Sequence, residues 1–245
     1  MSNNQLIYYK IQKMISSYTK INNIYEHDDM VKFYNNITNQ SSFNNDISFY
    51  KKKLDKSKFI IELASGSGRV LTELVDDGFN VTGIEYESAM INSMPLKYHE
   101  YVIQSDIFDF NTLSPLYQKV DSLILPATSI TLFSLEKFEN LLKNIMQLNK
   151  KFNIIFDFYN IEDLITESPK KVLNENGTFY SINFKNNNNF IYNLYHKEKD
   201  ILGISVKYEH SLDNLVSLLN RINMEVNVVP ITQSYYMIEG TYNEK

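Results

Sequence analysis

The chain has 245 residues, of which 43% are hydrophobic and 22% charged, and its formal net charge is −5 at pH 7. This length allows one large α/β domain that can carry an inserted subdomain. The acidic balance, without a basic stripe, argues against tight binding to a nucleic acid, and the absence of cysteine excludes disulfides, thiolate metal sites and a cysteine nucleophile.

Residues 1–57 are predicted to form polar helices with aromatic side chains between them. Apolar residues such as Ile7, Ile11 and Met14 recur there at helical spacing, so we expect a helical lid in front of the first strand. The sequence shows neither a signal peptide nor an apolar run of the ~20 residues needed to cross a bilayer. We therefore expect a cytoplasmic protein that does not bind membranes.

Residues 58–160 alternate between short apolar runs and amphipathic segments. This order predicts a parallel sheet with helices on both faces, built as one α/β core. The expected strands are 59–63, 80–85, 101–104, 120–125 and 152–158, and the expected helices include 69–77 and 134–148.

After residue 160 the pattern changes. Apolar stretches joined by short polar turns predict an antiparallel β insert over 161–210, which we expect on the substrate side, with strands at 178–184, 190–196 and 201–210. Residues 211–245 return to the α/β pattern and complete the core, with a helix at 212–222 and strands at 224–229 and 235–240.

The loop after the first strand carries the most specific motif. Its residues Glu62-x-Ala64-x-Gly66-x-Gly68 stand between an apolar strand and a helical pattern, a unit that builds nucleotide pockets. Leu71 occupies the position of the third glycine in a dinucleotide fingerprint, which argues against NAD and FAD.

The second strand, Val81-Thr-Gly-Ile-Glu85, ends in an acid that can accept hydrogen bonds from two ribose hydroxyls. Together with the loop motif, this resembles the class I S-adenosylmethionine (SAM) methyltransferases, with Ala64 in place of their usual first glycine. The resemblance extends over residues 59–240. It implies a Rossmann-like seven-stranded, mostly parallel sheet, and the insert is similar to that of small-molecule and amino-sugar N-methyltransferases.

The resemblance implies SAM as cofactor and S-adenosylhomocysteine as product. Glu85 would bind the ribose, Leu125 would lie beside the sulfonium, and Asp106 would accept from the adenine amine, although Asp106 could equally cap a turn. The implied cofactor contacts are Glu62, Ala64, Gly66, Gly68, Glu85, Tyr86, Asp106, Ile107 and Leu125.

The residues that act on the methyl acceptor are less defined by sequence. Candidates are Tyr25, His27, Tyr159 and His196, with Asp157 a further candidate proton acceptor. Aromatic residues of the lid and insert either cage a cationic amine or pack these segments against the sheet. No His/Asp/Glu set has metal-ligand spacing, so we expect no metal.

These features favour an enzyme that methylates a small molecule or a peptide, most favourably at nitrogen. The alternatives are an O-methyltransferase and a non-catalytic SAM-binding partner subunit. An RNA methyltransferase is disfavoured by the acidic charge and by Leu125-Pro-Ala-Thr128, where such enzymes carry an Asn/Asp-Pro-Pro-Tyr type motif. Exposed insert strands would suit a homodimer, and the sequence does not name the acceptor.

Overall fold

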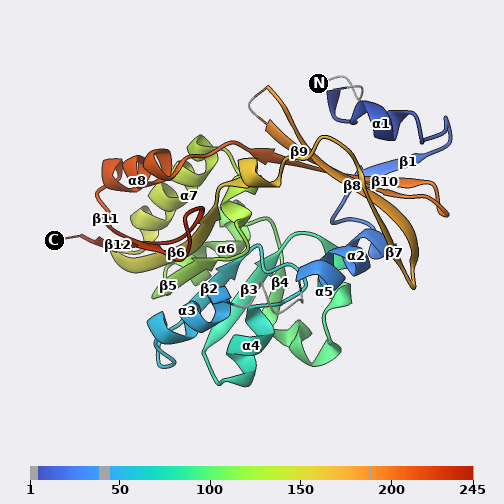
Figure 1. The fold of residues 1–245 in the computed structure, drawn as a ribbon. Coiled ribbons are helices and arrows are strands. Elements are labelled where there is room, and N and C mark those ends of the chain that lie inside the picture. Colours follow the sequence, from blue (N-terminus) through green and yellow to red (C-terminus); the bar gives the residue numbers. More distant parts are fainter. Residues whose placement is uncertain (1–4, 39–44, 188, 245) are drawn as a thin grey trace. The chain divides into compact units, whose positions relative to one another are not determined.

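A computed structural model describes residues 5–38, 45–187 and 189–244 (Figure 1). The chain divides into two compact units. The insert unit consists of Met1–Tyr34 and Ile161–Glu209, and the core unit consists of Asn35–Asn160 and His210–Lys245. Among the described residues, no helix combines the length and apolar character needed to cross a membrane.

The core unit contains a seven-stranded sheet in the order β11-β12-β6-β5-β2-β3-β4. Only β12 runs antiparallel to its two neighbours, β6 and β11, which confirms the mostly parallel Rossmann-like sheet. The strands are β2 (Ile60–Leu63), β3 (Val81–Glu85), β4 (Val102–Gln104), β5 (Ser122–Leu125), β6 (Lys151–Tyr159), β11 (Glu225–Pro230) and β12 (Tyr235–Asn243).

Helices cover both faces of this sheet because its central strands are apolar on both sides. Ile61 of β2 lies in one hydrophobic cluster with α6, α7 and α8, whereas Ile60 lies in a second cluster with α3 and α4. The helices are α3 (Asn45–Lys53), α4 (Leu71–Asp76), α5 (Ser88–Ser93), α6 (Phe110–Tyr117), α7 (Leu135–Leu148) and α8 (Leu212–Arg221), with 3-10 turns η3 (Leu96–Tyr101) and η4 (Ser129–Leu132).

The insert unit is built on a five-stranded sheet in the order β1-β10-β9-β8-β7. One face packs on Met30 and Phe33 of α2, and the other packs on Ile7 and on Ile11 of α1. Its elements are α1 (Tyr9–Gln12), β1 (Lys20–Asn23), α2 (Asp28–Thr38), η5 (Ile161–Leu164), β7 (Lys170–Asn174), β8 (Gly177–Asn186), β9 (Asn189–His196) and β10 (Ile201–Tyr208).

The structure corrects the prediction that residues 1–57 are helical throughout. Lys20–Asn23 forms strand β1, which pairs in parallel with β10. This segment is polar and mostly exposed, so it lacks the apolar alternation that marks a strand, and its conformation comes from pairing with β10. The sequence also gave no prediction for β7 or for α6, which contains Pro115 and begins after the side-chain cap Asp109.

Candidate active site

The loop between β2 and α4 has a left-handed backbone at alternate positions. The φ angles are +52° at Ala64, +57° at Gly66 and +81° at Gly68. A Cβ atom on Gly68 would lie 2.5 Å from Met94 Cε, and one on Gly66 would lie 3.0 Å from Met90 Cε. Both glycines are therefore favoured by conformation, and Gly68 is also favoured by space, because a Cβ there would meet three atoms of the Met94 side chain within 3.2 Å. Ala64 tolerates a conformation that usually costs an alanine about 1–2 kcal/mol.

Glu85 at the end of β3 is fixed against this loop. Its Oε2 accepts a hydrogen bond of 2.7 Å from Gly66 N–H, and its Oε1 accepts one of 2.9 Å from Glu87 N–H. The side chain is only 7% exposed. Burial raises the pKa of this carboxyl, and the backbone donors oppose that effect. Next to it, Tyr86 is 64% exposed and offers an aromatic face at the same sheet edge.

Glu62 is a buried acid in strand β2, just before the loop. It is 2% exposed, and its Oε2 is buried without a hydrogen-bond partner among the described residues. Burial raises the pKa of Glu62 well above its usual value, the Arg69 guanidinium opposes this, and the nearby Asp46 and Glu85 carboxylates add to it. A buried oxygen without a partner is costly, so this atom would be stabilised by a ligand that carries a donor or a positive charge.

Arg69 follows the last glycine of the loop and pairs with Asp46 of α3. Its Nη1 donates to Asp46 Oδ1 at 2.8 Å, and its Nη2 donates to Asp46 Oδ2, so the pair is bidentate. Asp46 is buried and Arg69 is largely so. This ion pair was not predicted from the sequence. The one feature that could have indicated it is an arginine directly after the glycine motif.

Asp157 lies near the end of β6 and is 1% exposed. Its Oδ2 accepts from Thr128 N–H at 2.7 Å and from Thr128 Oγ1–H at 3.0 Å, and its Oδ1 accepts from the Tyr50 hydroxyl at 3.3 Å. Burial raises the pKa of Asp157 to about 6, with the Asp46 charge adding to the shift and Thr128 and Arg69 opposing it. Both oxygens of this candidate base are thus bonded within the protein.

Solved structures of other proteins have a fold similar to that of most of this chain. A SAM-dependent methyltransferase from Clostridium acetobutylicum has a TM-score of 0.65 at 11% identity, with 87% of this chain and 99% of that chain covered. A sugar N-methyltransferase from Streptoalloteichus has a TM-score of 0.67 at 15% identity over 87% and 92%. A SAM-bound amino pentose methyltransferase from Micromonospora echinaspora has a TM-score of 0.61 at 11% identity over 87% and 97%.

The chain has the class I methyltransferase fold. No protein-family model matches it, and a search of curated proteins found no significant match. At these identities the likeness establishes the fold.

In this methyltransferase fold, Asp106 follows β4 and Leu125 ends β5. Asp106 is exposed, and its Oδ1 accepts from Phe108 N–H at 3.0 Å, which is the turn-capping geometry that the sequence left open. Leu125 and Ile107 are buried in the hydrophobic cluster with α6, α7 and α8. The predicted adenine and sulfonium contacts of these three residues stay predictions.

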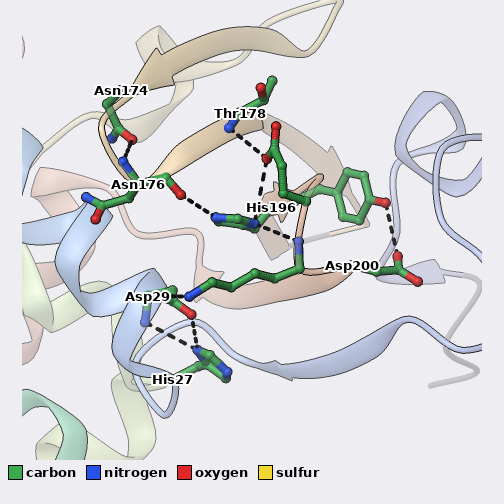
Figure 2. A network of polar contacts seen from close by, with 10 residues as sticks. His27, Asp29, Asn174, Asn176, Thr178, His196 and Asp200 are labelled. Carbon is green, nitrogen blue, oxygen red and sulfur yellow. Dashed lines mark hydrogen bonds and ion pairs between the residues drawn. The ribbon is translucent and has the colours of Figure 1, made fainter.

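The two candidate histidines belong to the insert unit, where each is held by its surroundings (Figure 2). His196 is buried, with Nε2 2.8 Å from Asn176 O and Nδ1 accepting from Lys199 N–H at 3.1 Å. His27 Nδ1 accepts from Asp29 N–H at 3.3 Å at the start of α2. Both ring nitrogens of His196 are engaged with backbone groups, so it would need to break a turn contact before acting as a base.

The remaining candidates for acceptor recognition are tyrosines. Within the insert unit, the Tyr25 ring meets the Tyr34 ring edge-on at 5.7 Å between centroids, and Tyr192 hydrogen-bonds with Ser181. In the core unit, the Tyr159 ring lies 6.3 Å from that of Tyr235. Across the described residues, no group of three or more His, Asp and Glu side chains is arranged to hold a metal ion.

Proposed function

We propose that this protein is a SAM-dependent methyltransferase that acts on a small-molecule or peptide acceptor, most favourably at nitrogen. The observation that carries the proposal is the Glu85 carboxylate bonded to the left-handed loop at Gly66 N–H. In dinucleotide-binding folds, the backbone N–H groups of this loop face a pyrophosphate. In this protein the Glu85 carboxylate already accepts a hydrogen bond from one of these groups, the N–H of Gly66.

The charges around the loop favour a cationic cofactor over a phosphorylated one. Glu85 and Glu62 are both buried beside the loop, and Glu62 Oε2 lacks a partner among the described residues. A pyrophosphate would be repelled by the Glu85 carboxylate, because like charges at short range are costly at low dielectric. SAM carries no phosphate; its ammonium and sulfonium groups would be attracted.

The residues present fit SAM. Gly66 and Gly68 leave room for its methionine end, Glu62 Oε2 would accept from its ammonium, and Glu85 would use its remaining lone pairs for the ribose hydroxyls. Tyr86, exposed beside Glu85, would cover the adenine. When bound, SAM supplies a methyl group that its sulfonium activates for displacement.

A nitrogen acceptor is supported by the structural neighbours and by the chemistry of the site. Two of them are named as N-methyltransferases, one of sugars and one of glycopeptides. A neutral amine attacks through its own lone pair: a nitrogen–carbon bond forms as the carbon–sulfur bond breaks, and the ammonium product loses a proton to water. This step needs no strong base, and the one buried acid near the end of β6, Asp157, is bonded within the protein.

Calorimetry and product analysis test the proposal. SAM and S-adenosylhomocysteine are expected to bind and NAD is not. With labelled SAM, a panel of amino sugars, hydroxylated sugars, amino-terminal peptides and transfer RNA is then assayed, and mass spectrometry locates the transferred methyl group. Transfer to an amine supports the proposal. NAD binding without SAM binding would refute the cofactor, and transfer only to oxygen or to RNA would refute the acceptor.

A further inference from the structure

Two successive residues after β5 adopt a conformation that non-glycine residues rarely hold. Ala127 has φ +59° and Thr128 has φ +55°. Each such residue costs about 1–2 kcal/mol and persists only where its surroundings hold it. The turn follows Leu125 at the carboxyl end of a central parallel strand, the edge at which this fold class places its ligands.

Asp157 on the neighbouring strand is hydrogen-bonded to this turn. β5 and β6 pair in parallel, with Leu125 opposite Phe156, so Asp157 lies one position beyond the last pair. Its Oδ2 receives two hydrogen bonds from Thr128, one from the backbone and one from the hydroxyl. Thr131 Oγ1 then donates to Thr128 O at 2.8 Å, which closes the turn from its other side.

Asp157 is itself held from other elements of the core unit. The Tyr50 hydroxyl of α3 donates to its Oδ1, and burial together with the negative charge of Asp157 raises the pKa of the nearby Tyr235 of β12. The charged groups that act on it are Asp46 of α3 and Arg69 of the glycine loop, which are paired with each other. The Arg69–Asp46 pair thus connects the glycine loop electrostatically to the turn after β5.

We propose that Asp157 is a positioning residue that holds the Ala127–Thr128 turn in its left-handed form at the edge of the methyl-donor site, and that this hold requires its carboxylate. The proposal rests on the methyltransferase function argued above. Because both oxygens of Asp157 accept hydrogen bonds within the protein, it acts on the reaction through the turn. A protonated Asp157 would lose its charge-assisted bonds to Thr128 and release the turn.

The test compares Asp157→Ala, Asp157→Asn and the double variant Asp157→Ala/Thr128→Gly. Asparagine keeps a carbonyl that can accept from Thr128 but cannot ionise, and glycine adopts positive φ at little cost. We expect Asp157→Ala to lower kcat by about 20-fold or more through misplacement of the site. At pH 8, Asp157→Asn should lower kcat to about the level that the unaltered protein shows below pH 6, because its neutral carbonyl lacks the charge-assisted bonds, and Thr128→Gly should restore about fivefold or more to the alanine variant.

The pH dependence provides a second readout. Because the pKa of Asp157 is raised to about 6, kcat of the unaltered protein should fall as the pH drops through about 6. The Asp157→Asn profile should lack this step near pH 6 and keep only the fall caused by protonation of the acceptor amine, which both proteins share. Hydrogen exchange at Thr128 N–H, which needs no turnover, should lose protection over the same pH range in the unaltered protein and stay constant in the asparagine variant.

Several outcomes would overturn the proposal. If Asp157→Asn were as inactive as Asp157→Ala while Thr128 N–H stayed protected, Asp157 would be a direct proton acceptor. If Thr128→Gly did not restore kcat in the Asp157→Ala variant, the loss of activity would not come from the turn, and Asp157 would not be its positioning residue. If the alanine variant did not fold, the asparagine pH profile and Thr128 exchange would decide. SAM affinity and turnover of the unaltered protein test the proposed function separately, so the two can fail independently.

Discussion

Gly66 N–H donates a 2.7 Å hydrogen bond to the Glu85 carboxylate, although Gly66 follows β2 and Glu85 ends β3. This bond fixes the acid at the end of β3 against the loop after β2. Parallel pairing of β2 with β3 brings the two carboxyl ends to one edge, with Leu63 opposite Ile84. The acid expected to hold a ribose is therefore pre-positioned by the loop expected to hold the methionine end.

Replacement of Glu85 by alanine should weaken SAM binding by ~2–4 kcal/mol, because two charge-assisted hydrogen bonds to ribose hydroxyls are lost. Titration calorimetry measures the change, with circular dichroism to confirm folding. Glu100→Ala, at an exposed acid of the same unit, is the control. Unchanged SAM affinity in a folded Glu85→Ala protein would remove Glu85 from the cofactor site.

Gly68 and Gly78 form a matched pair for testing the loop. Both have positive φ, but a Cβ on Gly78 would meet nothing within 4 Å, whereas one on Gly68 would lie 2.5 Å from Met94 Cε. Gly78→Ala should cost about 1 kcal/mol of stability from backbone strain alone. Gly68→Ala should cost about 2–3 kcal/mol and also reduce SAM affinity. Equal stability losses and equal SAM affinities would contradict a crowded loop at Gly68.

The sequence predicted the glycine loop and Glu85 because their signal is local. The Glu62–Gly68 motif begins near the end of the apolar strand β2, Glu85 ends the apolar strand β3, and the parallel pairing of these strands brings the two features to one edge of the sheet. The same local reasoning failed at β1, where Lys20–Asn23 carries no apolar alternation and is a strand only through its pairing with β10.

The pairs Asp46–Arg69 and Asp157–Thr128 could not be read from the sequence. Their partners stand 23 and 29 positions apart on different elements, and neither spacing matches a helical or strand period. Polar pairs of this kind are fixed by how the helix and strands dock in three dimensions. The left-handed turn at Thr128 likewise could not be predicted from the sequence, because threonine is not a residue type that indicates a positive φ.

Glu62 should couple SAM binding to proton release. Burial raises the pKa of Glu62 well above its usual value, so the unliganded site favours the protonated acid. An ammonium beside Oε2 would favour the carboxylate, and a proton would leave as SAM binds. SAM affinity should therefore rise with pH through this raised pKa. Calorimetry in buffers of different ionisation enthalpy counts the proton; Glu62→Gln should abolish it, and a pH-independent affinity in the unaltered protein would contradict the assignment.

Asp157→Asn should stabilise the protein at alkaline pH. The pKa of Asp157 is raised in the folded state to about 6, from an ordinary value of 3.8. The folded state therefore holds the proton more tightly, and stability falls as the pH rises through this window. The full penalty above pH 6 is about 3 kcal/mol, of which weaker hydrogen bonds in the variant would offset part. We expect a net gain of about 1–2 kcal/mol at pH 8.

Chemical denaturation at pH 8 and pH 4.5 measures this effect. The gain should shrink or vanish at pH 4.5, where Asp157 is protonated in the folded protein. A similar difference between variant and unaltered protein at the two pH values would show that the ionisation of Asp157 does not contribute. A gain in stability together with a changed pH–rate profile would identify Asp157 as a residue kept for function at a cost in stability.

Recognition of the acceptor should depend on aromatic side chains outside the cofactor loop. Tyr25 and Tyr192 belong to the insert unit and Tyr159 to the end of β6, and none of them lies in the loop that carries Gly66 and Gly68. Tyr→Leu substitutions at these positions should raise the Michaelis constant for the acceptor by about fivefold or more and leave SAM affinity within about threefold.

Tyr18→Leu is the control, because Tyr18 is 89% exposed. The decisive comparison is acceptor Michaelis constant against SAM affinity in the same folded variants. If all three substitutions left the Michaelis constant at the control value, the acceptor would have to be bound by other residues; if they weakened SAM binding instead, these tyrosines would belong to the cofactor site.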